Sequence, residues 1–177
     1  AGVMQLTGYN TYSGGTLVNE GVLSLARSGT SEGALAGSVT VNSGGTLRID
    51  AWDALGYTVG RGIVTVNTGG VLTVASGVRA TIRNTITLVG GTLAAVGTGD
   101  SQSGAGGGAS YSLFDGKGIA ATSDASGNAA TITAAKVGLQ DSGALTPFNV
   151  TRGSAAPAAD LIVSGSITRF NGSTNGI

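Results

Sequence analysis

The pattern that decides the fold occurs three times: Val18-Asn19-Glu20-Gly21-Val22-Leu23-Ser24-Leu25, Val41-Asn42-Ser43-Gly44-Gly45-Thr46-Leu47-Arg48-Ile49 and Val66-Asn67-Thr68-Gly69-Gly70-Val71-Leu72-Thr73-Val74. A degraded fourth copy, Thr87-Leu88-Val89-Gly90-Gly91-Thr92-Leu93-Ala94-Ala95, has leucine in the expected place of the asparagine. The copies thus follow one another at a spacing of roughly 21–25 residues, and a period in this range is typical of solenoid proteins. In such proteins each repeat forms one structural unit.

Within each copy apolar residues alternate with polar ones, as in Val64 and Val66 and then Leu72 and Val74. This two-residue period indicates β-strands with one buried face, and no stretch shows a sustained helical period. Glycine and asparagine, which accept positive φ most readily, form the turn between the paired strands. We therefore predict an all-β fold, a right-handed parallel β-helix (β-solenoid) with coils of about 21–25 residues.

In such a coil, equivalent side chains of successive repeats stack about 4.8 Å apart. The predicted core ladder consists of Leu23, Leu47, Leu72 and Leu93. Further stacks are expected from Leu25, Ile49 and Val74, and from Val18, Val41 and Val66. The repeated asparagines, Asn19, Asn42 and Asn67, would line one corner. There they either hydrogen-bond one another along the axis or are simply exposed turn residues.

Composition excludes several classes of function. The chain has 177 residues, 33 of them glycine and only 2 proline, with equal numbers of acidic and basic residues and no basic run. This argues against nucleic-acid binding. Cysteine and histidine are both absent. The commonest general base and metal ligand are therefore missing, and we predict no cofactor. No apolar run approaches the ~18 residues that span a bilayer, so no membrane contact is expected for this segment.

The second half of the chain is less regular. Residues 97–110, rich in glycine and serine, are expected to form a flexible excursion from the coil because they have little to bury. Short strands are expected at 111–114, 129–137, 148–151 and 161–167, separated by clusters of turn residues. Both prolines fall in connections. The chain is thus expected to form a single β-helix domain over residues 1–177.

One acidic pair could carry chemistry. Asp50 and Asp53 flank Trp52, with Arg48 nearby. Two carboxylates beside an aromatic ring could form a sugar-cleaving site. These residues also follow the end of a predicted strand, where acids and a half-exposed tryptophan are ordinary loop residues. We favour the loop interpretation and expect no catalytic residue.

The N-terminal region resembles a known family. Asn10-Thr11-Tyr12-Ser13-Gly14-Gly15-Thr16, followed by Val18-Asn19 and Gly21-Val22-Leu23, is similar to the autotransporter-associated β-strand repeat, also called the passenger-associated transport repeat. The similarity is close over residues 3–25. It implies a parallel β-helix in large secreted or surface-displayed bacterial proteins that act as stalks, fibres or adhesins, without catalytic residues. The motif positions are Asn10, Thr11, Tyr12, Gly14 and Gly15, together with the repeated asparagines.

We therefore expect a structural or adhesive segment of an extracellular or outer-surface bacterial protein, and not an enzyme. The stretch 161–167 resembles the strand that precedes the next copy of the motif, which favours one unit of a longer repeat array. The expected partners are copies of the same unit, stacked end to end. One alternative is an adhesin module that binds host or matrix glycans or proteins, and another is a polysaccharide-degrading β-helix enzyme.

Overall fold

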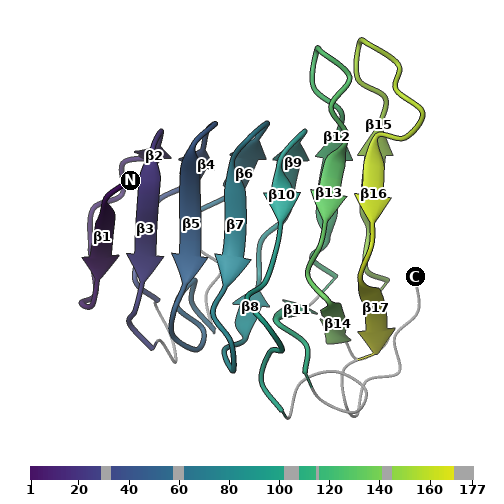
Figure 1. Cartoon of the computed structure of the whole chain (residues 1–177). Coiled ribbons are helices and arrows are strands. Elements are labelled where there is room, and N and C mark those ends of the chain that lie inside the picture. Colours follow the sequence, from purple (N-terminus) through teal and green to yellow (C-terminus); the bar gives the residue numbers. More distant parts are fainter. Residues whose placement is uncertain (29–32, 58–61, 102–107, 115, 141–144, 170–177) are drawn as a thin grey trace.

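The computed structural model describes residues 1–28, 33–57, 62–101, 108–114, 116–140 and 145–169. Within these ranges every regular element is a β-strand, and the strands form three parallel sheets without any helix. The strands stack in rows from β1, near the N-terminus, to β16 and β17 at the opposite end (Figure 1). The predicted all-β class with parallel strands is confirmed.

The seven-stranded sheet is called sheet A, the six-stranded one sheet B and the four-stranded one sheet C. Sheet A contains β1 Val3–Leu6, β3 Gly21–Leu25, β5 Gly45–Ile49, β7 Val71–Val74, β10 Thr92–Leu93, β13 Ala130–Ile132 and β16 Leu161–Val163. Sheet B contains β2 Thr16–Val18, β4 Val39–Val41, β6 Val64–Asn67, β9 Ile86–Val89, β12 Ile119–Thr122 and β15 Phe148–Thr151. Sheet C contains β8 Ala80–Ile82, β11 Tyr111–Phe114, β14 Lys136–Gln140 and β17 Ser166–Arg169. From β6 onward the chain visits B, A and C in turn, and each circuit is one coil.

Alternation of side chains along the strands builds the core. In β5, Leu47 and Ile49 are fully buried, whereas Thr46 and Arg48, which alternate with them, are partly exposed. The register pairs Leu23 with Leu47, Leu47 with Leu72 and Leu72 with Leu93, so all four lie in one buried column of sheet A. Parallel columns contain Leu25, Ile49 and Val74 in sheet A, and Val18, Val41 and Val66 in sheet B. Small and medium-sized side chains thus fill a thin interior.

The paired glycines of the repeat lie where the chain turns from sheet B to sheet A. Gly44 has φ +84°, a left-handed conformation that side chains with a Cβ rarely adopt. Gly45 is limited by space instead, because a Cβ added there would lie 2.2 Å from the carbonyl oxygen of Val18. The first glycine therefore bends the chain, and the second lets two strands approach closely.

The predicted length of the coils holds only for the early ones. The successive partners Leu23, Leu47, Leu72 and Leu93 all follow one another within the predicted range. The next coil is longer, because Thr92 and its partner Thr131 are 39 residues apart in sequence. The step from Ile132 to its partner Val163 also exceeds the prediction. The prediction is wrong for these coils because insertions between the strands lengthen them, although the strands still pair in register.

Two predicted strands are each divided by a turn. The stretch 129–137 contains sheet A strand β13 and the start of sheet C strand β14. Likewise 161–167 contains β16 and the start of β17. In both places the chain passes from sheet A to sheet C. Apolar alternation continues on either side of this bend, so the sequence pattern did not reveal it.

The predicted excursion at 97–110 is closed at its base. Asp100 and Ala109 form an isolated antiparallel bridge, and both are buried. The Gly99 amide donates to the Gly108 carbonyl at 3.0 Å, and the Gly108 amide donates to the Asp100 carbonyl at 2.8 Å. The excursion therefore leaves and re-enters the coil at one point. Residues 102–107, on which the predicted flexibility falls, lie outside the described residues.

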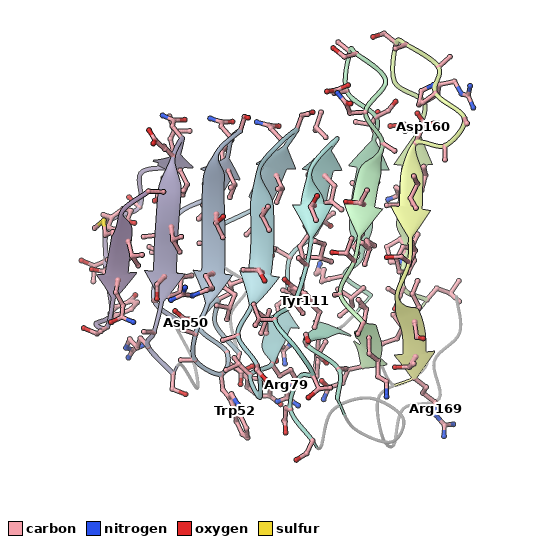
Figure 2. All side chains as sticks on the ribbon, in the orientation of Figure 1. Asp50, Trp52, Arg79, Tyr111, Asp160 and Arg169 are labelled. Atoms are coloured by element: carbon pink, nitrogen blue, oxygen red, sulfur yellow. The ribbon has the colours of Figure 1, made fainter. Side chains whose placement is uncertain are left out.

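One large polar-tipped side chain crosses the core. Tyr111 of β11 is fully buried in a position where the neighbouring coils have Ala80 and Val137. Its hydroxyl lies 2.8 Å from the carbonyl oxygen of Ala94 and 3.2 Å from that of Leu72. Burial raises the pKa of this phenol well above its ordinary value of 10.0. Tyr111 thus links sheet C to the sheet A side of the coil (Figure 2).

Candidate functional site

The acidic pair identified in the sequence lies where the chain leaves sheet A. Asp50 directly follows β5, and its carboxylate accepts hydrogen bonds from the Ser24 hydroxyl at 2.5 Å and from Arg48 Nε at 2.7 Å. Burial opposes ionisation of Asp50, but the bonds from Arg48 and Ser24 outweigh it and hold the pKa of this carboxyl below its ordinary value. Asp50 therefore stays ionised and joins β5 to β3.

Asp53 faces a different partner. Its carboxylate accepts a hydrogen bond from the Thr81 hydroxyl, in β8, at 2.5 Å. Trp52 between the two acids is 47% exposed, and its indole Nε1 donates to the carbonyl of Gly77 at 3.2 Å. The side chain of Asp50 thus bonds back to an earlier coil, while the side chains of Trp52 and Asp53 bond forward to a later one.

This geometry does not favour glycoside hydrolysis. A general acid at neutral pH needs a carboxyl whose pKa is raised, whereas that of Asp50 is lowered. Each carboxylate of the pair is also engaged by a side chain of a neighbouring strand. Trp52, between the two acids, keeps an exposed aromatic surface that could contact a ligand.

The motif residues of the N-terminal region join the first two coils. The Asn10 side-chain amide donates to the carbonyl of Ala34 at 2.9 Å and to that of Gly8 at 3.0 Å. The hydroxyls of Tyr12 and Thr16 lie 2.9 Å apart. Thr11, Gly14 and Gly15 are exposed. The motif therefore makes local structural contacts and does not gather reactive groups.

The repeated asparagines form a ladder. The Asn42 amide donates to the Asn19 side-chain oxygen at 2.7 Å, and the Asn67 amide donates to the Asn42 side-chain oxygen at 2.7 Å. Both donors point toward the N-terminal end, so the ladder has one direction. Such amide stacking joins successive coils at the corner between sheets B and A.

The ladder ends at the fourth copy. The register pairs Asn67 with Val89 and Val66 with the buried Leu88, so the expectation that leucine takes the place of asparagine is wrong. The reason is that the turn from sheet B to sheet A is one residue shorter in the fourth copy. Asn67 and Val71 are four residues apart, whereas their respective partners, Val89 and Thr92, are three residues apart.

Asp124 reaches across this shortened turn. It lies in the connection from β12 to β13, and its carboxylate accepts a hydrogen bond from the Thr68 hydroxyl at 2.6 Å, 56 residues away in sequence. The Asn128 amide donates to the same carboxylate at 2.7 Å. Bonds from Asn128 and Thr68 lower the pKa of Asp124 far below its ordinary value. Gly90 leaves room for this contact, because a Cβ there would meet the Thr68 hydroxyl at 2.4 Å.

A second acid, which is buried, fixes the next connection. Asp160 accepts hydrogen bonds from the Ser123 hydroxyl at 2.6 Å and from the Gly153 amide at 3.0 Å. These bonds hold its pKa below the ordinary value. The connections 123–129 and 152–160 project beyond the strands as two adjacent arms (Figure 1). The sequence did not reveal these roles, because the partners Thr68 and Ser123 are distant along the chain from their acids.

No cluster of three or more potential metal-ligating side chains occurs among the described residues. In the same part of the chain, no helix is long and apolar enough to cross a membrane.

Comparison of the sequence with protein-family profiles and with curated proteins, and of the fold with solved structures, found no match. The acids Asp50, Asp124 and Asp160 bond to other parts of the chain, whereas apolar side chains are exposed at both ends of sheet A.

Proposed function

We propose that this chain is a structural segment of a large extracellular bacterial surface protein, in which β-helix units stack end to end into a stalk or fibre. The observation that carries this proposal is the continuity of the sheets. The same parallel pairing repeats through sheet A from β1 to β16. Each terminal strand exposes large apolar side chains: Val3 and Met4 at one end, Ile162 and Val163 at the other.

We propose that the coil is right-handed. Strands of one parallel sheet that follow one another along the chain are joined by crossovers, and about 98% of such crossovers are right-handed because of the twist of the strands. Every strand pair that the structure describes between successive coils is parallel. A right-handed parallel β-helix is therefore the finer description that we propose.

Two further observations support a structural role over an enzymatic one. The carboxylates of Asp50, Asp124 and Asp160 are each occupied by hydrogen bonds that join coils or connections. The resemblance of residues 3–25 to the autotransporter-associated repeat supports the extracellular location. Binding of a glycan or protein through the exposed Trp52 is the alternative.

The test is assembly of the 177-residue chain across a wide concentration range. We expect light scattering to show an average mass that rises with concentration. Small-angle X-ray scattering and electron micrographs should show rods whose length grows while their width stays constant. Compact monomers at every concentration would contradict a fibre formed by stacking.

A further inference from the structure

Sheet A carries one column of inward side chains from end to end. In order these are Met4, Leu23, Leu47, Leu72, Leu93, Ile132 and Val163. The five inner members are at most 6% exposed, whereas Met4 is 64% and Val163 38% exposed. Within the described part of the chain, the terminal members differ from the others in having a paired strand on one side only. Both remain apolar, as a buried position requires.

The outward column of the same sheet also keeps one type of side chain from end to end. All its members are β-branched: Val3, Val22, Thr46, Val71, Thr92, Thr131 and Ile162. The terminal strands β1 (VMQL) and β16 (LIV) contain no charged residue and no proline. Monomeric proteins usually protect an edge strand with such residues, because its free N–H and C=O groups otherwise pair with another chain. Both edges of sheet A are therefore built like inner strands.

We propose that sheet A continues from one copy into the next through a parallel pairing of β16 with β1, in which Val163 lies beside Met4. This inference rests on the proposed function and specifies its joint. The occupant of each end is a second copy, because the joint repeats the coil-on-coil contact that the molecule already makes between its own strands. The joint is head to tail, so it leaves both outer ends free and forms open filaments.

Register follows from the faces of the strands. A slip of one residue would turn Met4 outward and Val3 inward, against the pattern of every inner strand. Pairing Val163 with Met4 also places Leu161 beside Gly2, so a large apolar side chain of one edge meets a residue without a side chain. Two copies joined by their N-terminal ends would instead bring β1 against β1 in antiparallel orientation, which occurs between no strands of these sheets.

The joint is confined to sheet A by a step at the N-terminal end. Sheet A has seven strands and sheet B six, because β1 precedes the first strand of sheet B. When β1 of one copy pairs with β16 of the next, a gap of one strand is left in sheet B between β15 of one copy and β2 of the other. Leu17 of β2 and Asn149 of β15, the end members of an outward column of sheet B, are then about 9–10 Å apart along the axis, two strand spacings.

Engineered disulfides test this arrangement, since the chain has no cysteine of its own. In the variant Met4→Cys with Val163→Cys, the joint brings the two Cα atoms to about 4.8 Å, inside the range of a disulfide. We expect mild oxidation to give a ladder of covalent dimers, trimers and longer species on non-reducing gels, which peptide mass spectrometry assigns to the 4–163 link. Each single variant should give no species beyond a dimer.

The matched control is Leu17→Cys with Asn149→Cys, two exposed positions at the same ends. It should form no ladder, because two strand spacings exceed the roughly 7 Å limit between the Cα atoms of a disulfide. If this control crosslinks and the Met4–Val163 pair does not, the joint in sheet A is wrong. The same conclusion follows if Met4→Cys alone crosslinks as fully as the pair, because the ends then meet head to head.

Light scattering on the same samples separates this inference from the proposed function. If rods grow but no 4–163 link forms, the proposed pairing of β16 with β1 is wrong and end-to-end stacking still holds. If the protein stays monomeric at every concentration, both the pairing and the stacking are wrong. As a second variant, Met4→Lys should abolish growth of the rods while the thermal midpoint stays near that of the wild type. Thr131→Lys, an outward position one strand inside the opposite edge, should assemble normally. Normal growth of rods by the Met4→Lys variant would contradict the proposed pairing of β16 with β1.

Discussion

At the scale of single residues, the sequence repeats a glycine pair whose members have different physical roles. Gly44 adopts positive φ, and a Cβ added there would meet nothing closer than the carbonyl oxygen of Asn19, at 3.5 Å. Gly45 has ordinary φ but no room for a Cβ beside Val18. Conformation limits the first position and sterics limit the second. Substitutions should therefore distinguish them.

We predict that Gly45→Ala destabilises the fold by about 1–3 kcal/mol, since the carbonyl of Val18 must move. Gly45→Asn should cost more than Gly45→Ala because it is larger. At Gly44 the order should reverse, because asparagine tolerates positive φ better than alanine. Chemical denaturation measures all four variants. Gly14→Ala is the control, since nothing lies within 4 Å of a Cβ there. The same order of costs at both positions would contradict this division.

At the scale of elements, the two arms at the C-terminal end depend on two acids, one of which bonds to an earlier coil while the other joins the second arm to the first. Asp124 joins the first arm to Thr68, and Asp160 joins the second arm to Ser123. Both carboxyls have lowered pKa values. A lowered pKa means that the folded state favours the ionised form. Its contribution to stability is present above the ordinary pKa of 3.8 and is lost as the pH falls through the folded value.

We predict that Asp160→Asn lowers the thermal midpoint at neutral pH, because an uncharged amide oxygen accepts the bonds from Ser123 and Gly153 more weakly than a carboxylate oxygen does. The difference from the wild type should begin to shrink as the pH falls below the ordinary pKa of 3.8, and it should be lost once the pH has passed the lowered pKa of the folded carboxyl. Thermal unfolding followed by circular dichroism at several pH values measures this. A difference that is independent of pH would show that charge at Asp160 is not the cause.

At the scale of the whole molecule, stability comes from contacts between neighbouring coils. Strands of each sheet pair only with the strands of the coils on either side. Such a solenoid has a stability that is close to a sum of units and of nearest-neighbour interfaces. A buried residue of a middle coil therefore contributes to two interfaces, whereas a residue of an end coil contributes to one.

We predict that Leu72→Ala costs about 2–5 kcal/mol, because it opens a cavity between Leu47 and Leu93. Under conditions where the protein is monomeric, Met4→Ala should cost much less, since Met4 has a neighbour on one side only. Leu17→Ala, at a side chain that is 67% exposed, should stay within about 0.5 kcal/mol of the wild type. Equal costs for Leu72→Ala and Leu17→Ala would show that the inward column does not carry the stability.

The strand class, the turn and the pairing of the regular copies could all be predicted from the amino-acid sequence. Side-chain alternation is a local property, so the burial of Leu47 and Ile49 follows from the pleat. The repeat period then indicates which residues lie above one another, as Leu23 and Leu47 do. Where the period fails, after Leu93, sequence could not indicate the next partner. Ile132 is separated from it by an insertion whose length has no local signal.

Only the tertiary structure decided how distant polar side chains are used. Asp50 and Asp53 are neighbours in sequence and could have shared a site, but they bond to different strands. Asp124 and Asp160 are isolated in sequence, yet each holds a connection in place through a partner that is 56 or 37 residues away. The physical reason is that a hydrogen bond depends on distance in space, and the stacking of coils brings together residues that no sequence spacing relates.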